Sequence, residues 1–467
     1  MRAMSRTAAP PQARITLMAE RTYFGTDGIR GVAGKRPMTA LFAFKTGAAV
    51  TEAIKHTGKA APSVVIGTDT RRSGQMLAQA AGAGIMSRGG TVIYLGILPT
   101  PGVSYLARAL DADAGIVISA SHNPFEDNGI KLFNGSGEKL SDAVEHEVEA
   151  LLHQDPDGLP SVTGEAIGTS QRYRRDDDDY MDFLLENAPY LDGLKVGLDC
   201  ANGASYQLAP RLFQKIGARL DVTNAHPDGL NINVACGSTH PEKMQTRVRE
   251  LELDVGITFD GDADRALLVD KKGRLVTGDH ILAICALARG EKTVVATLMS
   301  NLGVERFLAE RGVELVRTKV GDRYVHAELK KRGLTLGGEQ SGHLLFLDKA
   351  PTGDGIMTAL QTLAAVRKSG RALESWMDDI PNYPQVLENV RVPNALKRSI
   401  KSHPEVSEAV ARVESALGDD GRINLRPSGT EPLVRVMVEG ADQARVEMLA
   451  KSVAQVVASV SEGTKTA

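Results

Sequence analysis

The chain has 467 residues, of which 42% are hydrophobic and 24% charged, with a formal net charge of −3 at pH 7. This length is too great for a single core and suggests roughly three domains, while the composition is that of a folded protein rather than a disordered one. The small net charge argues against binding to nucleic acid or to an anionic membrane, and no apolar run approaches the ~20 residues of a membrane span.

The N-terminal residues carry no secretory signal. Residues 1–17 are rich in Ala, Pro, Arg and Ser and lack the apolar stretch that such a signal requires. We expect residues 1–20 to be a disordered extension, or the start site to have been placed upstream of Met18. The three cysteines are widely spaced and form no CxxC pair, which predicts idle thiols in a reducing compartment and a cytoplasmic protein.

Strands alternate with helices from residue 21 onward. We expect a strand at 63–69, a helix at 75–87, a strand at 91–95, a short helix at 101–110 and a strand at 114–118. Such alternation with short connections predicts βαβ units and a mostly parallel sheet. The pattern restarts at strands 195–199 and 293–297, which predicts three related α/β domains.

The pattern of expected strands and helices changes after residue 371. Three prolines, Pro381, Pro384 and Pro393, mark a linker, and short strands then alternate with helices. The alternation predicts a smaller C-terminal α+β domain. The expected domain boundaries are 21–170, 171–270, 271–380 and 381–467.

The loop Ser119-Ala120-Ser121-His122-Asn123-Pro124 follows an apolar strand. Ser121 therefore lies at the carboxyl end of a strand, where open α/β sheets bind their ligands. Its small neighbours leave the hydroxyl accessible, which suits a nucleophile. An ordinary loop or capping serine fits the same pattern.

A second loop carries three alternating carboxylates directly after another apolar strand, at Asp260, Asp262 and Asp264. In an extended segment alternate side chains share a face, so the three negative charges converge and call for a hard cation such as Mg²⁺. An EF-hand is excluded, because its sixth and twelfth positions are here Arg265 and Lys271 instead of Gly and Glu. A turn of capping aspartates is the structural alternative.

Two further loops combine glycines with polar side chains. In Gly337-Gly338-Glu339-Gln340-Ser341-Gly342-His343, a carboxylate and a hydroxyl suit the hydroxyl groups of a sugar, although a simple turn fits as well. Arg426-Pro427-Ser428-Gly429-Thr430-Glu431-Pro432 lies between two expected strands. Its guanidinium, hydroxyl and backbone N–H donors favour an anion site over a plain hairpin.

Together these motifs resemble the α-D-phosphohexomutase superfamily, and within it the bacterial phosphoglucosamine mutases. The similarity runs from Tyr23 to about Ser459, with the four motifs in the family's order and spacing. The resemblance implies an α/β fold of three related domains with mixed, mostly parallel sheets and a smaller C-terminal α+β domain, grouped around a central cleft.

The resemblance also implies roles for individual residues. Ser121 matches the serine that is phosphorylated in the active enzyme, and Asp260, Asp262 and Asp264 match the Mg²⁺ ligands, with phosphoserine 121 supplying a further oxygen. The basic residues matched near the transfer centre are Arg30, His122, Lys131 and His343, with Lys131 expected to transfer a proton at a lowered pKa. The substrate contacts matched are Arg265, Glu339, Ser341, Arg426, Ser428, Gly429 and Thr430.

The implied activity is the interconversion of glucosamine 6-phosphate and glucosamine 1-phosphate through a phosphoserine enzyme and a 1,6-bisphosphate, supplying UDP-N-acetylglucosamine for the cell wall. Glucosamine or glucose 1,6-bisphosphate is the implied activator and intermediate. Gln340 favours this branch, because phosphomannomutase/phosphoglucomutase enzymes usually have Met there. The expected partner is a hexosamine phosphate, without nucleic acid or membrane, and a homodimer is compatible with the family.

Three alternatives stay open at the level of sequence. The chain could be a phosphomannomutase/phosphoglucomutase of the same superfamily. It could be a phosphohydrolase in which Asp260 itself is phosphorylated and Asp262 assists. A non-catalytic sugar-phosphate sensor is the third alternative, and the combination of Ser121, the three aspartates and Lys131 argues against it.

Overall fold

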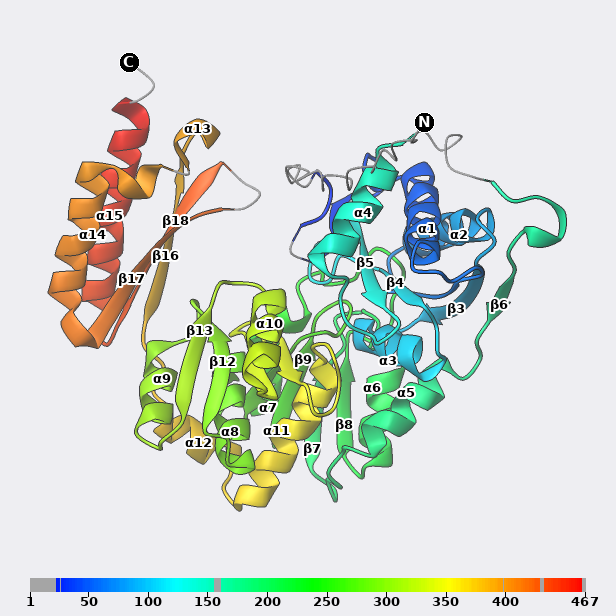
Figure 1. Ribbon diagram of the computed structural model, residues 1–467. Helices are drawn as coiled ribbons and strands as arrows, with labels where there is room; N and C mark the ends of the chain where they lie inside the picture. Colours follow the sequence, from blue (N-terminus) through cyan, green and yellow to red (C-terminus); the bar gives the residue numbers. More distant parts are fainter. Residues whose placement is uncertain (1–21, 26, 155–160, 398, 429–431, 464–467) are drawn as a thin grey trace, which may run out of the picture.

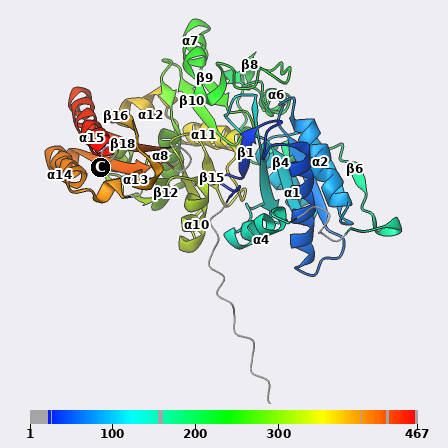
Figure 2. The same cartoon turned by 90° about the horizontal axis from the view of Figure 1, so that it is seen from above.

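The structure is a computed structural model that describes residues 22–25, 27–154, 161–397, 399–428 and 432–463. The expected N-terminal extension, residues 1–20, lies outside the described residues. Three α/β domains lie against one another, and a smaller domain, drawn in orange and red, stands beside them (Figure 1). Figure 2 gives the same arrangement from above. The α/β fold with three domains and a smaller fourth is confirmed.

The first three sheets contain the same four-strand unit. In the first sheet its order is β5-β4-β2-β3, formed by β2 (Ser63–Thr68), β3 (Thr91–Ile97), β4 (Ala114–Ile118) and β5 (Asp127–Asn134). In the second it is β10-β9-β7-β8, formed by β7 (Lys195–Asp199), β8 (Arg219–Thr223), β9 (Val255–Phe259) and β10 (Ala266–Asp270). In the third it is β15-β14-β12-β13, formed by β12 (Thr293–Thr297), β13 (Glu314–Thr318), β14 (Leu336–Gly338) and β15 (Leu344–Phe346).

Within each unit three strands are parallel and the fourth runs antiparallel at one side. This shared order confirms the predicted relationship among the three domains. Short strands extend the first two sheets: β1 (Ile29–Val32) beside β5, β6 (Ser170–Arg172) beside β3, and β11 (Leu275–Val276) beside β10. Strands β6 and β11 extend the first and second sheets beyond residues 170 and 270, at which the sequence analysis placed the ends of these domains.

Helices cover the sheets of the first three domains. The first domain contributes α1 (Ala40–Lys55), α2 (Gly74–Met86), α3 (Thr100–Ala109) and α4 (Asp142–Leu152). The second contributes α5 (Asp176–Leu185), α6 (Leu208–Lys215) and α7 (Glu242–Glu250). The third contributes α8 (Gly278–Arg289), α9 (Leu302–Ala309), α10 (Asp322–Arg332), α11 (Gly355–Ser369) and α12 (Leu373–Asp379).

Local chemistry explains where these elements begin and what they bury. Helix α1 starts after Thr39, whose hydroxyl accepts a hydrogen bond from the backbone N–H of Phe42. Helix α11 starts after Asp354, which caps Met357 N–H, and ends at Gly370 in the left-handed conformation. Every residue of β4 and β9 is buried, as expected for central strands covered on both faces.

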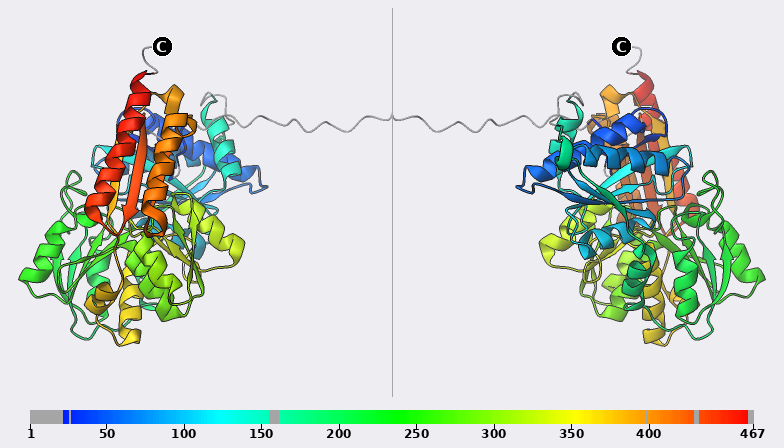
Figure 3. Two further views of the ribbon diagram at one scale, coloured as in Figure 1. Left: turned by 90° about the vertical axis from the view of Figure 1, so that its left-hand side faces the viewer. Right: turned by 90° about the vertical axis from the view of Figure 1, so that its right-hand side faces the viewer.

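The fourth domain is a three-stranded antiparallel sheet in the order β16-β18-β17, with β16 (Gln385–Arg391), β17 (Gly421–Pro427) and β18 (Leu433–Gly440). Helices α14 (Pro404–Leu417) and α15 (Gln443–Gly463) lie over one face of that sheet (Figure 3), and α13 (Asn394–Lys397) is a single turn. No helix formed by the described residues is long and apolar enough to cross a bilayer.

Candidate active site

Three of the predicted motifs occupy the same place in the repeated sheet. Each lies on the connection from the last parallel strand to the antiparallel one: Ser121 between β4 and β5, the three aspartates between β9 and β10, and Glu339 to His343 between β14 and β15. The carboxyl ends of parallel strands are where such sheets bind ligands, so each domain presents one loop in an equivalent position. The domain packing then brings these loops together.

Ser121 is buried at the end of β4 and its hydroxyl points at the carboxylate loop. Its backbone has φ +53°, a left-handed conformation that is uncommon outside glycine. The Oγ donates a hydrogen bond of 2.5 Å to Asp260 Oδ2 and lies 3.3 Å from His122 Nδ1. The structure therefore places the predicted nucleophile within direct contact of the predicted cation site.

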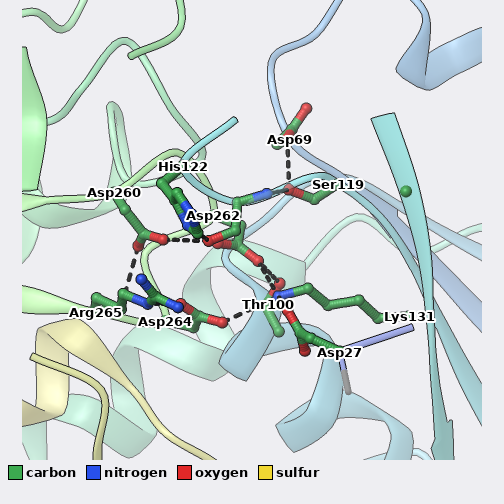
Figure 4. A network of polar contacts seen from close by, with 12 residues as sticks. Asp27, Asp69, Thr100, Ser119, His122, Lys131, Asp260, Asp262, Asp264 and Arg265 are labelled. Atoms are coloured by element: carbon green, nitrogen blue, oxygen red, sulfur yellow. Dashed lines mark hydrogen bonds and ion pairs between the residues drawn. The ribbon is translucent and has the colours of Figure 1, made fainter. Parts of the chain in front are cut away.

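Asp260, Asp262 and Asp264 are all buried, and one oxygen of each lies within 4.8 Å of the others. Figure 4 shows the three carboxylates converging. Oδ1 of Asp262 and Oδ1 of Asp264 are buried without a hydrogen-bond partner in the described structure. Burial, and then repulsion from the other two carboxylates, raises the pKa of Asp260 well above its ordinary value. Unpartnered oxygens on converging carboxylates fit an oxygen-seeking cation such as Mg²⁺.

Lys131 is the buried cation of this centre. Its Nζ lies 2.7 Å from Asp262 Oδ2, 3.0 Å from Asp264 Oδ2 and 3.1 Å from Asp27 Oδ2 (Figure 4). Burial alone would lower its pKa, and Arg30 acts in the same direction, but the three carboxylates raise the pKa well above the ordinary lysine value. The expectation of a lowered pKa is wrong for this arrangement, because opposite charges surround the ammonium group.

The pKa values of the two histidines of the centre are shifted in opposite directions. Burial, followed by the nearby guanidinium groups, lowers the pKa of His122 to about 4, so its ring is neutral at pH 7. Burial would also lower the pKa of His343, but Asp264 and Asp322 raise it above its ordinary value. Its ring nitrogens lie 3.6 Å from Asp264 Oδ1 and 3.5 Å from Asp322 Oδ2.

Two further groups hold the reacting loops, and the sequence analysis assigned no role to either. Arg71, after β2, is buried and donates to the carbonyl oxygens of Ser121 at 2.9 Å and Asn123 at 2.8 Å. Asp69 accepts from Arg71 Nε at 2.9 Å and from Ser119 Oγ at 2.5 Å. The signal available in the sequence was a charged pair at the carboxyl end of the strand 63–69.

Thr100 links the first domain to the metal loop. Its Oγ1 donates to Asp262 Oδ2 at 2.6 Å, and its backbone N–H donates to the Asp262 carbonyl at 2.9 Å. Figure 4 shows this threonine beside the carboxylates. Nothing in the local sequence of α3 distinguishes Thr100 from an ordinary helix start.

A cavity of about 430 Å³ opens beside the reacting loops and is lined by three domains. Its walls include the predicted residues Arg30, His122, Asp264, Arg265, Glu339 and His343, together with Tyr23, Gly25, Asp27, Gly28, Val320, Gly321 and Asp322. Ser341 does not line it, and its buried hydroxyl has no partner among the described residues. A larger cavity of about 670 Å³, behind the Arg71 loop, contains none of the predicted site residues.

The predicted phosphate site of the fourth domain lies at the end of β17, outside the 430 Å³ cavity. Arg426 pairs across the sheet with Arg435 in register. Burial, followed by that second guanidinium, lowers the pKa of Arg426. Two cations opposite each other favour a bound anion. Ser428 is buried, whereas Gly429 and Thr430 lie outside the described residues.

Four domain families match consecutive stretches of the chain. They are phosphoglucomutase/phosphomannomutase alpha/beta/alpha domain I at residues 21–157, domain II at 178–273, domain III at 277–383 and the C-terminal domain at 387–456. Together they cover all four domains of the fold.

Relatives and solved structures agree with these matches. A phosphoglucosamine mutase of Deinococcus deserti is 54% identical over 440 residues, covering 94% of this chain and 99% of that protein. One of Thermus thermophilus is 51% identical, covering 95% and 99%. A phosphoglucomutase/phosphomannomutase family protein of Burkholderia thailandensis is 25% identical with a TM-score of 0.78, covering 93% and 97%. The Aspergillus fumigatus N-acetylphosphoglucosamine mutase, solved with GlcNAc-6P and magnesium, is 18% identical with a TM-score of 0.64, covering 94% and 96%, and shares the fold.

Proposed function

The chain belongs to the phosphoglucomutase/phosphomannomutase family, and from that membership we propose that it interconverts glucosamine 6-phosphate and glucosamine 1-phosphate. It is a phosphohexomutase, an isomerase that moves a phosphoryl group within a sugar phosphate. The glucosamine substrate follows from the relatives that share about half of its residues over nearly the whole chain. The observation that carries the chemistry is the Ser121 hydroxyl, 2.5 Å from a carboxylate of the buried aspartate cluster.

Ser121 would act as a phosphoryl carrier. The phosphorus–oxygen bond to Ser121 breaks while the free hydroxyl of the sugar monophosphate forms a new bond to the same phosphorus. The products are a 1,6-bisphosphate and a free Ser121 hydroxyl, which carries the proton that the sugar hydroxyl lost. The bisphosphate turns over, its other phosphoryl group returns to Ser121, and the isomeric monophosphate leaves. Positioning and charge stabilisation supply most of the catalysis in such transfers.

The chain's own residues prepare this transfer by holding and orienting charge. Asp260, Asp262 and Asp264 would hold Mg²⁺, which when bound neutralises charge on the transferring oxygens. Arg30 and Arg265 line the cavity and offer guanidinium donors to phosphate. Lys131 holds its proton in the arrangement described, so its proposed role in proton transfer requires that it first lose that proton.

The fourth domain would grip the phosphate that is not reacting, through Arg426, Ser428, Gly429 and Thr430. Turnover of the bisphosphate exchanges its two phosphates, so this grip must accept either end of the sugar. Glucosamine or glucose 1,6-bisphosphate would serve as the activator, since it reloads an unphosphorylated Ser121.

The test combines activity with the location of the phosphate. A coupled assay with glucosamine, glucose and mannose phosphates is expected to show the highest kcat/KM for the glucosamine compounds. Ser121→Ala is expected to abolish turnover while leaving sugar-phosphate binding in place, and intact mass with peptide mapping should place one phosphate on Ser121. Full activity of this variant would end the proposal.

One chemical measurement distinguishes the proposed mutase from the alternative, a phosphohydrolase. A phosphate carried on Asp260 would be an acyl phosphate, which hydroxylamine cleaves, whereas a serine phosphate resists it. We expect the labelled enzyme to keep its phosphate in hydroxylamine. In the structure Asp260 already accepts the Ser121 hydroxyl, an arrangement that supports the serine as carrier.

A further inference from the structure

Four carboxylates line the 430 Å³ cavity, and two of them are occupied by cations of the protein or by the proposed metal site. Asp27 places Oδ1 2.5 Å from Lys139 Nζ, and its Oδ2 accepts from Arg30 at 2.5 Å and faces Lys131 at 3.1 Å. Asp264 places Oδ2 3.0 Å from Lys131, while its Oδ1 belongs to the proposed cation site. Neither has an oxygen left for the substrate.

Asp322 differs from both, because only one of its oxygens is engaged. It begins α10 and presents Oδ2 to Lys139 Nζ at 2.5 Å, with the His343 ring at 3.5 Å from the same oxygen. Its Oδ1 has no hydrogen-bond partner among the described residues, and its side chain is 13% exposed. Burial would raise its pKa, but Lys139 and His343 lower it, so the carboxylate is charged at neutral pH.

Two basic side chains bear on Asp322, and both face its Oδ2. Lys139 is a single ammonium group shared between Asp27 and Asp322, and it is not part of the cavity wall, whereas His343 is. The other oxygen of Asp322, Oδ1, is therefore the one available to a ligand in the cavity.

Glu339, the fourth carboxylate, lies next to Asp322 but in a different electrostatic setting. Its Oε1 accepts from the backbone N–H of Gly321 at 3.0 Å, which joins the two loops. The guanidinium of Arg265, itself in the cavity wall, interacts with the Glu339 charge. Glu339 therefore faces the cavity beside the guanidinium of Arg265, whereas Lys139, the ammonium group paired with Asp322, does not line the cavity.

We propose that Asp322 receives the 2-ammonium group of the hexosamine phosphate and is a specificity-determining residue of this site. The inference rests on the proposed function, since only an amino sugar carries a cation at that position. A glucose phosphate offers a neutral hydroxyl there, and hydrogen bonds between opposite charges are roughly twice as strong as neutral ones. The carboxylate therefore binds the amino sugar more tightly than the neutral sugar.

The experiment compares two substrates that differ only at carbon 2, glucosamine 1-phosphate and glucose 1-phosphate, with the Mg²⁺-loaded full-length enzyme. The readout is the ratio of their kcat/KM values, in which a general loss of activity cancels. Asp322→Asn is expected to lower this ratio about 10-fold, the difference between a charged and a neutral hydrogen bond. Asp322→Glu, which keeps the charge, is expected to retain most of the ratio.

Asp142→Asn is the matched control. Asp142 is an exposed carboxylate of the first domain whose Oδ1 accepts from Arg323, the residue next to Asp322, at 3.0 Å. It does not line the cavity, so its removal should leave the ratio unchanged. If Asp322→Asn fails to fold, the same ratio is measured with Asp322→Ser.

The outcomes separate this inference from the proposed function. A wild-type enzyme that turns over both sugars equally well would overturn both. A wild type that prefers the glucosamine compound, with both kcat/KM values falling in the same proportion in Asp322→Asn, would overturn the role of Asp322 alone. A selective loss on glucosamine 1-phosphate supports it.

Discussion

The first three domains and the fourth domain hold their parts of the site in different ways. One continuous hydrophobic core runs through the first three, from Phe133 through Phe259 to Leu344. The fourth domain has its own core, built from β17, β18, α14 and α15. Figure 1 shows the fourth domain standing beside the other three.

Hydrogen bonds and ion pairs join these two regions. Arg422 donates to the carbonyl oxygens of Leu298 and Ser300, the first at 2.9 Å, and Glu439 accepts from Leu302 N–H at 2.8 Å. Buried polar side chains also cross the seams within the first three domains, as with Thr100 and Asp262 or Tyr180 and Asp354, but these domains share an apolar core as well. Interfaces that rest on polar contacts allow relative motion more readily than a shared apolar core does.

This difference between a shared core and a separately folded domain matches what the proposed reaction requires. Phosphoryl transfer needs fixed distances between Ser121 and the carboxylates, and a shared core supplies them. Turnover of a bisphosphate needs a grip that releases and closes again, and a separately folded domain can move without disturbing the reacting centre. Three substitutions test this division.

The largest effect is expected in the rigid region, from Lys131→Met. The variant leaves Asp27, Asp262 and Asp264 without their shared cation, and removing one partner of a buried ion pair costs about 3–5 kcal/mol. In EDTA the variant should melt below the wild type, and added Mg²⁺ should raise its Tm by more, because no ammonium competes for the carboxylates. Turnover should fall about 100-fold.

Lys330→Ala is the control for that prediction. Lys330 of the third domain pairs with Glu138 of the first, so it also crosses a seam between domains, but at the surface. Exposed ion pairs contribute about 0–1 kcal/mol, so the control should resemble the wild type in stability and in its response to Mg²⁺. An Lys131→Met enzyme that behaves like this control would show that the buried charges do not set the stability of the centre.

The next effect is a pH dependence at the seam between the third and fourth domains. Asp279 is buried, accepts from Asn301 N–H at 2.8 Å, and burial raises its pKa to about 6. The folded state therefore binds this proton more tightly than the unfolded chain, whose ordinary pKa is 3.8. Below about pH 4 the Asp279 carboxyl does not lower the free energy of unfolding. As the pH rises through about 6 it lowers that free energy increasingly.

Asp279→Asn keeps an oxygen for Asn301 and removes the charge. At pH 8 it should be more stable than the wild type by up to about 3 kcal/mol, and this difference should vanish near pH 4. Urea unfolding at both pH values measures it. A difference that does not change with pH would contradict the assignment of the charge cost to this carboxyl.

The smallest change in stability, but a specific change in binding, is expected from Arg426→Ala in the fourth domain. Loss of one hydrogen bond to a charged phosphate costs about 1.5–3 kcal/mol, so KM should rise roughly 10- to 100-fold. Thermal unfolding and phosphorylation of Ser121 should stay as in the wild type. Arg412→Ala, on the outer helix α14 and paired with Glu408, is the control and should leave KM unchanged.

The sequence by itself determined the repeated α/β architecture and the four loops. Apolar strands such as 114–118 and 255–259 are followed directly by the polar residues they present, so element and motif lie within a few positions of each other. The alternating aspartates likewise predicted a cluster of carboxylates, but not its geometry. The expected extended segment is a turn, in which Ala263 has φ +54° and its N–H donates to the Asp260 carbonyl at 3.1 Å.

Only the tertiary structure decided the charge state of Lys131 and the contacts of Arg71, Thr100, Lys139 and Asp322. Each depends on a partner far away in the chain, as in the contact of Lys139 with Asp322, 183 residues apart. Such pairs cannot be predicted from local spacing. The pKa of a buried group, and which of its atoms lack a hydrogen-bond partner, depend on the residues that the folded domains bring next to it.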